Sequence, residues 1–299
     1  MRTETDTSSD AELLTTREVA GLLRIRERKV YDLVASGEIP HVRVTGKLLF
    51  PRALLDAWLV RHSESREITP RVWPDIVAGS HDPLLDWALR EAGSGLATFF
   101  DGSLDGLQRL AQGDALMAGL HLVEGGDRWN VGHIEQRLAG EPVVLVEWAQ
   151  REQGFILPPG NPAGIRGPGD LKGRRLIPRQ RAAGSFLLLQ HLLQAEGLSL
   201  DALDLAAPPA RTEADVAIAI AEGKAEVGLG LAAMARQFRL DFVPLVRERF
   251  DLAIWRRAFF EPPLQRLWAF CRTASFAAKA RDLGGYDVGG FGRVHYNGP

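Results

Sequence analysis

Apolar positions near the start of the chain follow a helical spacing. Val19, Leu22 and Leu23 share one face of a helix predicted from residue 16, and a threonine at position 15 or 16 can cap it. A second helix is predicted over residues 27–35, with Val30, Leu33 and Val34 turned inward and charged side chains turned to solvent. Ser36-Gly37 ends it with a residue suited to left-handed backbone geometry.

A turn-rich stretch follows the second helix. Residues 39–44 and 47–50 flank a turn at Thr45-Gly46, which predicts a short two-stranded wing. Pro51 begins a third helix, predicted over residues 52–60. The order helix, turn, helix, wing, helix is typical of a compact reader of DNA.

The pattern changes beyond residue 72, where short apolar runs alternate with longer amphipathic stretches. The predicted strands are residues 75–78, 97–100, 115–120, 143–148 and 226–229. The predicted helices are residues 83–91, 104–112, 186–196 and 215–222. Strands that alternate with helices predict an α/β fold with a largely parallel sheet. Prolines and glycines at 158–164 divide this half of the chain into two predicted lobes.

These changes of pattern set the expected domain boundaries. At 299 residues the chain is longer than one hydrophobic core usually supports, so more than one folding unit is expected. We expect a frayed polar tail at 1–12, a winged helix-turn-helix at 13–61, a polar linker at 62–72 and a two-lobed domain at 73–299. Within that domain, lobe I is expected at about 73–150 plus a C-terminal return, and lobe II at about 160–250.

Composition narrows the compartment and the partners. The chain is 45% hydrophobic and 25% charged, as is usual for a globular protein. It has no apolar run of about 18 residues and no secretory signal at its start, so we expect a cytoplasmic protein without a membrane partner. Cys271 is the single cysteine and cannot form an internal disulfide.

Charge is unevenly distributed along the chain. The net charge is −2, yet residues 14–61 hold nine basic and five acidic side chains. Basic groups on a helix and a wing can neutralise phosphates, and arginine can also bind a guanine edge. For any single side chain, a solvated helix face is the alternative. The candidate DNA-contacting residues are Arg17, Arg26, Arg28, Lys29, Tyr31, Arg43, Lys47 and Arg52.

Residues 14–60 resemble the excisionase-like, MerR-related family of winged helix DNA-binding domains. The resemblance rests on Leu14–Ala20, Val30–Pro40, Val42–Val44 and Phe50–Arg52. It implies that this part of the chain binds double-stranded DNA. The sequence departs from the family at one point, because Arg24 and Arg26 stand where the family shows a glycine and then a serine that caps the second helix.

Three serines lie where a predicted strand is followed by a helix: Ser80, Ser103 and Ser185. Hydroxyls and backbone N–H groups at helix N-termini bind anions, and ligands bind at such strand ends in open α/β sheets. We therefore expect the three serines to converge on one cleft around a small anion, with Arg181 adding positive charge and His121 lining the cleft. The alternative is that all three are ordinary N-caps. A cleft lined with acids would instead favour a neutral or cationic ligand.

Residues 72–294 resemble the periplasmic-binding-protein superfamily, in particular the cytoplasmic substrate-binding domains attached to helix-turn-helix regulators. The resemblance rests on residues 79–82, 102–103, 183–185, 221–230 and 284–287. It implies two lobes that close on a small solute, and relatives include binders of molybdate or tungstate. The candidate ligand-binding residues are Ser80, His81, Ser103, His121, Arg181, Gly184 and Ser185.

Residues arranged for catalysis are scarce. His121 and His133 flank Glu124 without a second close histidine, which does not make a zinc site. The glycine-rich segments lack the lysine and the strand-then-helix context of a phosphate loop. We expect no enzyme activity, no catalytic residue, no metal and no cofactor.

The sequence thus predicts a ligand-responsive transcriptional regulator. We expect a homodimer that binds double-stranded DNA and senses a small anionic solute, such as a molybdate-like or tungstate-like oxyanion. The alternative is a cytoplasmic binding protein that handles an oxyanion or a cofactor and whose N-terminal domain docks a protein partner. A recombination accessory factor would explain residues 14–60 but leave the rest of the chain without a role.

Overall fold

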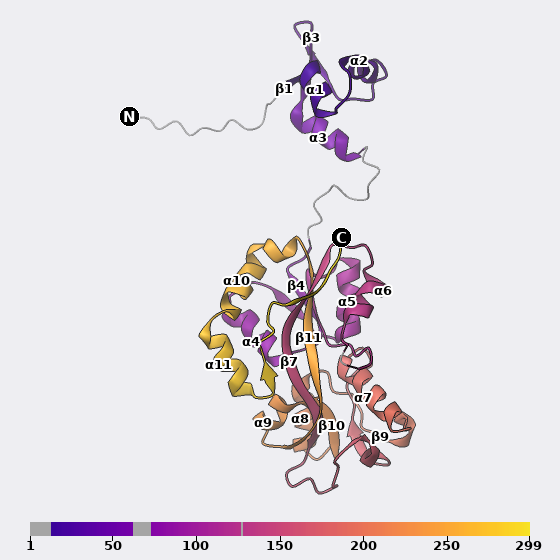
Figure 1. Cartoon of the computed structure of the whole chain (residues 1–299), viewed down its shortest axis with the longest axis vertical. Helices are drawn as coiled ribbons and strands as arrows, with labels where there is room; N and C mark the ends of the chain where they lie inside the picture. Colours follow the sequence, from indigo (N-terminus) through magenta and orange to yellow (C-terminus); the bar gives the residue numbers. More distant parts are fainter. Residues whose placement is uncertain (1–12, 62–72, 127) are drawn as a thin grey trace, which may run out of the picture. The chain divides into compact units, whose positions relative to one another are not determined.

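The computed structural model of the chain describes residues 13–61, 73–126 and 128–299. The chain forms two compact units, Met1–Val72 and Trp73–Pro299 (Figure 1). The segments expected as tail and linker, 1–12 and 62–72, lie outside the described residues.

The first unit has the predicted order of helix, turn, helix, wing and helix. Its elements are β1 (Leu13–Thr15), α1 (Thr16–Leu22), α2 (Glu27–Ala35), β2 (Val42–Val44), β3 (Lys47–Pro51) and α3 (Arg52–Arg61). Thr15 caps α1, and its side chain and that of Glu18 bond to each other's backbone N–H. The short strand β1 was not predicted, and it pairs antiparallel with β3, so that the two-stranded wing is part of a three-stranded sheet.

A small apolar core holds the first unit together. Its buried side chains are Leu14, Val19, Ala20, Val30, Ile39, Phe50 and Leu55. The prediction that Leu22 faces this core is wrong, since 41% of Leu22 is exposed. Helix α1 ends at Leu22, and the chain then turns so that Leu23 packs against the core in its place.

The second unit consists of two lobes. Lobe I contains β4 (Ile76–Gly79), α4 (Pro83–Glu91), β5 (Ala97–Phe99), α5 (Ser103–Gln112), β6 (Met117–Leu120), α6 (Val131–Arg137), η3 (Ala258–Phe260), α10 (Pro262–Cys271), α11 (Ala274–Leu283), β12 (Tyr286–Asp287) and β13 (Val294–Asn297). Lobe II contains η1 (Pro168–Leu171), β8 (Arg175–Ile177), α7 (Gly184–Ala195), η2 (Leu200–Ala202), β9 (Asp204–Leu205), α8 (Glu213–Ala221), β10 (Val227–Leu231) and α9 (Ala232–Gln237). Two long strands, β7 (Val143–Leu157) and β11 (Asp241–Trp255), run through both lobes (Figure 1).

One sheet joins the two lobes, in the strand order β5-β4-β6-β11-β7-β10-β8-β9. The expected parallel pairing holds for its outer strands, where β4 pairs with β5 and β6, and β8 pairs with β9 and β10. It is wrong for the centre, because β7 and β11 are antiparallel along their whole length. Helices α4, α10 and α11 cover one side of lobe I, and α5 and α6 cover the other side (Figure 1).

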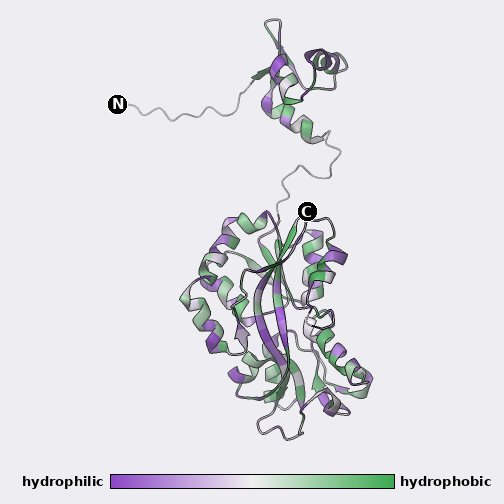
Figure 2. Cartoon of the chain, viewed as in Figure 1, coloured by the Kyte–Doolittle hydropathy of each residue, from purple (hydrophilic) through white to green (hydrophobic). Residues whose placement is uncertain are grey.

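The two central strands are polar in the middle of their length, as Figure 2 shows. The predicted strand ended at residue 148, because the polar residues 150–153 interrupt the apolar run. Strand β11 was not predicted. Yet Arg151, Gln153 and Glu248 are fully buried. The polar centre of the sheet therefore lies between the apolar cores of the two lobes.

Across residues 13–61, 73–126 and 128–299, no helix combines the length and the apolar character needed to cross a membrane.

Candidate ligand site and DNA interface

The strand ends of the two lobes face each other at what we call the seam. Ser80, His81 and His121 follow β4 and β6 in lobe I, and Ser103 begins α5. Arg179 follows β8 in lobe II, Ser185 lies in the first turn of α7, and Glu213 begins α8. The seam is thus built from the carboxyl ends of strands and the N-termini of helices, where open α/β sheets hold their ligands.

The three predicted serines are buried at the seam, and two of them touch. The Ser80 and Ser103 hydroxyl oxygens lie 2.8 Å apart, and the Ser103 oxygen also accepts the His121 backbone N–H at 3.1 Å. Ser185 is only 1% exposed, and its hydroxyl has no hydrogen-bond partner. The alternative that all three are N-caps is wrong, because the N-caps of α4, α5 and α7 are Asp82, Gly102 and Ala183.

The backbones of the two lobes approach each other closely around these serines. The Leu104 N–H, in the first turn of α5, donates to the Ala182 carbonyl of lobe II at 3.1 Å. Gly102 has φ +110°, and a Cβ there would lie 2.5 Å from the same carbonyl oxygen. A Cβ on Gly184 would lie 2.6 Å from the His121 carbonyl oxygen. Both glycines are therefore required by the contact between the lobes.

Arg151 of β7 forms the centre of a buried ion network. Its guanidinium donates to Asp82 at 2.9 Å and to Glu248 of β11, and it stacks over the Phe250 ring at 4.3 Å. Burial alone would lower the pKa of Arg151, but the carboxylates of Glu248 and Asp82 raise it above its usual value. The network ties lobe I to both crossing strands.

His121 and Gln153 complete the surroundings of Glu248. His121 Nδ1 lies 2.8 Å from Glu248 Oε2 and must donate to it, and Gln153 Nε2 donates to Oε1 at 3.1 Å. Burial would raise the pKa of Glu248, but Arg151, His121 and Gln153 lower it to about 2. Glu248 is therefore ionised at neutral pH. The Gln153 carbonyl oxygen remains without a partner.

Asp82 has donors on several sides. It caps α4 through the Leu85 N–H at 2.7 Å and accepts from the Trp148 indole at 3.0 Å and from the Tyr286 hydroxyl at 2.6 Å. Burial and the Asp82 charge together raise the pKa of Tyr286 well above its usual value, so it stays protonated. The Asp82 oxygens are thus already bonded within the protein.

A second buried ion pair lies on the lobe II side of the seam. Arg179 donates to Glu213 Oε1 and to the Gln180 side chain, at 3.2 Å for the latter. The other carboxylate oxygen of Glu213 is buried without a partner. Opposite, His81 packs edge-on against Phe100, and its Nδ1 also lacks a partner. Burial lowers the pKa of His81, so it is neutral at pH 7, although Glu213 and Asp82 act against this shift.

The seam differs from the sequence prediction in its charged groups. Arg181 is exposed on the turn before α7, and the buried arginines are Arg151 and Arg179 instead. The sequence reasoning missed both of them, as well as Asp82, Glu213 and Glu248. For Arg151 and Glu248 the available signal was the polar stretch in the middle of β7 and β11; the other three missed residues lie outside these strands.

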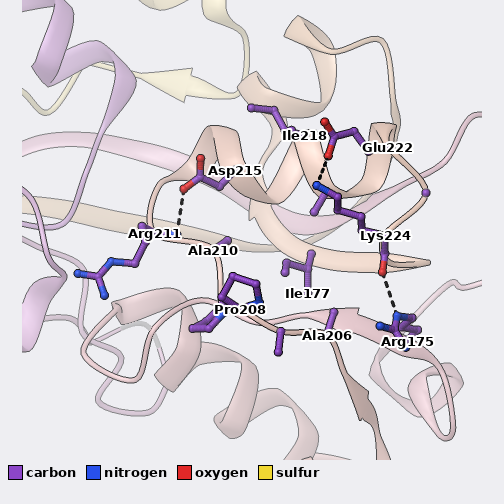
Figure 3. Close-up of a pocket in the computed structure, with 14 residues that line it drawn as sticks. Arg175, Ile177, Ala206, Pro208, Ala210, Arg211, Asp215, Ile218, Glu222 and Lys224 are labelled. Atoms are coloured by element: carbon purple, nitrogen blue, oxygen red, sulfur yellow. Dashed lines mark hydrogen bonds and ion pairs between the residues drawn. The ribbon is translucent and has the colours of Figure 1, made fainter.

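A separate open pocket of about 670 Å³ lies on lobe II, between β8, the 206–211 loop and α8 (Figure 3). Its charged side chains bond mainly to neighbouring groups: Lys224 pairs with Glu222 at 2.5 Å, and the Arg175 side chain donates to the Lys224 carbonyl at 3.0 Å. The pocket contains none of the three serines.

The predicted DNA-contacting side chains lie on the surface of the first unit. Arg28, Lys29 and Tyr31 are exposed on α2, and Arg43 and Lys47 are exposed on the wing. Val30 alone of α2 is fully buried, so these side chains are not needed by the core. Arg17 and Arg26 are also exposed, whereas Arg52 is held by Asp56 at 3.0 Å. These residues form the candidate nucleic-acid interface.

The turn between α1 and α2 explains why two arginines there are unusual. The Arg24 N–H bonds to the Gly21 carbonyl and the Ile25 N–H to the Ala20 carbonyl, which is the Schellman arrangement with Arg24 at the left-handed position. Arg24 has φ +52°, a conformation that favours glycine. Arg26 is the N-cap of α2 and makes no side-chain capping bond. Both arginines are therefore retained at a cost to local stability.

Comparisons with known proteins agree with the division into two units. Residues 13–63 match the helix-turn-helix domain family, and residues 86–272 match the PBP superfamily domain. The uncharacterized protein YvgK of Bacillus subtilis is 25% identical over 94% of this chain and 96% of its own length. An uncharacterized protein from the 5′ region of a 2Fe-2S ferredoxin gene of Clostridium pasteurianum is 31% identical over 80 residues, which are 26% of this chain and 71% of that protein.

A solved structure shares the fold of the second unit. A putative phosphate ABC transporter substrate-binding protein with bound phosphate, from Clostridium perfringens, superposes with a TM-score of 0.52 at 10% identity, over 70% of this chain and 96% of that one. The predicted helix-turn-helix and the predicted binding-protein-like α/β fold are thereby confirmed. Because the match at 86–272 spans more than half of the residues, the chain belongs to the PBP superfamily, with a helix-turn-helix domain preceding the matched region.

Proposed function

We propose that this protein is a regulator whose DNA binding responds to a small solute held at the seam. One observation carries the proposal: the seam contains buried polar atoms without partners, in the same chain as a helix-turn-helix domain. These atoms are Ser185 Oγ, Gln153 Oε1, Glu213 Oε2, Arg151 Nε and His81 Nδ1. Buried polar groups nearly always have a partner, so an unpartnered set on these strand ends and on the crossing strand β7 favours a ligand site.

The serine side of the seam supports an anionic group on the solute. The N-termini of α5 and α7 meet there, and the Leu104 N–H already donates to a carbonyl oxygen. A carboxylate or an oxyanion such as molybdate, tungstate or phosphate takes the same kind of donor. The proposed contacts are Ser80, His81, Ser103, His121, Gly184 and Ser185, with the exposed Arg181 adding positive charge near the start of α7.

The first unit would bind double-stranded DNA through α2 and the wing. In this arrangement α2 enters the major groove and the basic wing residues meet phosphates. We further propose that two copies of the chain pair on DNA, since one winged helix supplies few contacts and pairing doubles the site. The protein then works in the cytoplasm by binding rather than by catalysis.

The test uses the full chain with DNA fragments selected on it from a random-sequence pool. Fluorescence anisotropy at several salt concentrations measures DNA binding, and a thermal-shift panel of oxyanions, carboxylates, nucleosides and amino acids measures solute binding. A solute at about 100 times its dissociation constant adds about 2.7 kcal/mol of stability, which such a panel detects. We expect one solute to stabilise the chain and to change its DNA affinity.

Two outcomes would contradict the proposal. Solute binding without any salt-dependent DNA binding would favour a binding protein whose first unit docks a protein partner. DNA binding that no solute alters would contradict the proposed response to a ligand.

A further inference from the structure

The seam has an acidic side as well as a serine side. Three buried carboxylates, those of Asp82, Glu213 and Glu248, lie among two buried guanidiniums, those of Arg151 and Arg179. Asp82 and Glu248 are bonded through both of their oxygens. Glu213 is the exception, because it bonds to Arg179 through one oxygen while the other is buried and free.

The free oxygen of Glu213 belongs to the seam rather than to the outer surface of lobe II. Glu213 is 1% exposed and begins α8, and its charge acts on His81 of lobe I and on Arg151 of the crossing strand. A Cβ on Gly230, at the end of β10, would lie 3.5 Å from this oxygen. The carboxylate therefore lies where the strand ends of lobe II meet lobe I.

A second free acceptor lies on the crossing strand β7, beside Gly154, which pairs with Gly230. Gln153 is fully buried, and its amide group already donates to Glu248, so its free atom is the carbonyl oxygen. A carboxylate oxygen and an amide oxygen can only accept hydrogen bonds. A solute that satisfies them must bring N–H or O–H donors, and one beside a buried carboxylate is favoured when it is positively charged.

We propose that the solute is a zwitterion of amino-acid size, whose anionic group meets the serines and whose protonated amine meets Glu213. This inference rests on the proposed function, because it specifies the solute held at the same seam. A fully deprotonated oxyanion offers no donor to Glu213 or Gln153, and its charge adds to the net negative charge of the three carboxylates and two guanidiniums. An ammonium group offers three donors and balances the excess negative charge.

The test compares matched acids that differ only in the amine. Isothermal titration of the full chain measures binding of the twenty amino acids, of their counterparts without the amine, such as succinate for aspartate and propionate for alanine, and of molybdate, sulfate and phosphate. We expect an amino acid to bind at least about 10-fold more tightly than its amine-free counterpart, since a hydrogen bond to a charged group contributes about 1.5–3 kcal/mol.

The variant Glu213→Gln locates the amine subsite. It keeps the side-chain size and an oxygen for Arg179 but removes the charge. The affinity for the amino acid should therefore fall by about 10- to 100-fold, and the difference in affinity between the amino acid and its amine-free counterpart should become smaller. Glu222→Gln, an exposed carboxylate at the end of the same helix, is the matched control and should leave binding unchanged. If Glu213→Gln does not fold, the comparison of matched acids on the natural chain still decides the solute class.

The outcomes separate this inference from the proposed function. Binding of an oxyanion or an amine-free acid as tightly as any amino acid would overturn the zwitterion and leave the regulator intact. Equal binding of an amino acid by the natural chain and by Glu213→Gln would overturn the placement of the amine. Failure of every probe to bind, together with DNA binding that no solute alters, would overturn both.

Discussion

The free hydroxyl of Ser185 separates a binding role from a structural one. A buried hydroxyl without a partner costs folding free energy, so Ser185→Ala should leave the stability of the unliganded chain unchanged or raise it by up to about 1 kcal/mol. The same change should weaken solute binding by roughly 1.5–3 kcal/mol if the solute atom there is charged. Thermal melting and titration calorimetry measure the two effects.

Ser103→Ala is the contrasting variant, because this hydroxyl is bonded to Ser80 and to the His121 N–H. It should lower the stability by about 1–2 kcal/mol. If Ser185→Ala were as destabilising as Ser103→Ala, the Ser185 hydroxyl would have a role in the fold, and the proposed contact would lose its support.

Glu248 should make the stability of the second unit depend on acidity. Its pKa is about 2 in the folded chain and near 4.5 when unfolded, so the unfolded chain takes up the proton first as the pH falls. The stabilisation is complete above about pH 4.5 and is lost as the pH falls towards about 2, a change of about 3 kcal/mol. Glu248→Gln should flatten the dependence of the urea midpoint on pH in this window.

Glu141→Gln removes an exposed carboxylate of the same unit and should leave that dependence as it is. An unaltered slope in Glu248→Gln would mean that other carboxylates dominate acid unfolding.

Residue by residue, the sequence predicted the hydroxyls of the seam better than its charges. Ser80, Ser103 and Ser185 could be placed because each follows a recognisable strand or a glycine-containing turn. Arg151, Glu213 and Glu248 could not, since a charged residue is normally expected at the surface and its burial depends on partners far along the chain. Glu248, for example, is 97 residues from Arg151.

At the scale of the elements, the turn between α1 and α2 offers a gain in stability. Arg24→Gly removes the backbone strain of a non-glycine residue in the left-handed conformation, and Arg26→Ser supplies a hydroxyl that can cap α2. The double variant should therefore stabilise the first unit by about 1–2 kcal/mol. Hydrogen exchange of the α1 and α2 amides measures this unit by itself.

Arg28→Gly, in the first turn of α2, is the control and should destabilise the unit by up to about 1 kcal/mol. The double variant also removes two basic groups, so weaker DNA binding together with higher stability would indicate that these arginines are retained for DNA. Lower stability in the double variant would contradict the geometry of the turn.

Helix α2 is expected to meet DNA through Arg28 and Lys29. Replacement of both Arg28 and Lys29 by alanine should leave melting unchanged, because both side chains are exposed. DNA affinity should fall, and the slope of log affinity against log salt should flatten by up to about two units if both meet phosphates. The double variant Arg272→Ala and Arg281→Ala removes two exposed charges of the second unit and should not alter the slope. If the α2 variant still bound DNA with an unaltered slope, α2 would not be part of the DNA interface.

The elements that could be predicted are those whose periodicity is local. Helices α2 and α4 begin and end at the predicted residues, because their apolar faces and end signals lie within the elements themselves. Strand β7 was predicted for less than half of its length and β11 not at all. Both strands bury polar residues against each other and against His121 and Asp82, so their environment depends on distant pairing.

For the whole molecule, the proposed function requires the two units to be coupled. If the solute changes the affinity of the chain for DNA by some factor, DNA must change the affinity of the chain for the solute by the same factor, because the coupling free energy is reciprocal. The solute used is the one that most stabilises the full chain in the thermal-shift panel. Calorimetry with and without DNA, compared with anisotropy with and without solute, should give the two factors in agreement.

Ser103→Leu tests whether this coupling begins at the seam. Ser103 is fully buried between Ser80 and the His121 backbone, so a leucine there overpacks the lobe contact, at a cost of about 1–3 kcal/mol to stability, and blocks the solute. Ser103 lies in the second unit, whereas the candidate DNA-contacting side chains lie in the first, so DNA affinity without solute should match the natural chain. The response of that affinity to solute should disappear. Ser199→Leu, at an exposed serine of lobe II, should keep the full response. A folded Ser103→Leu chain that still responded to the solute would move the sensing site away from the seam.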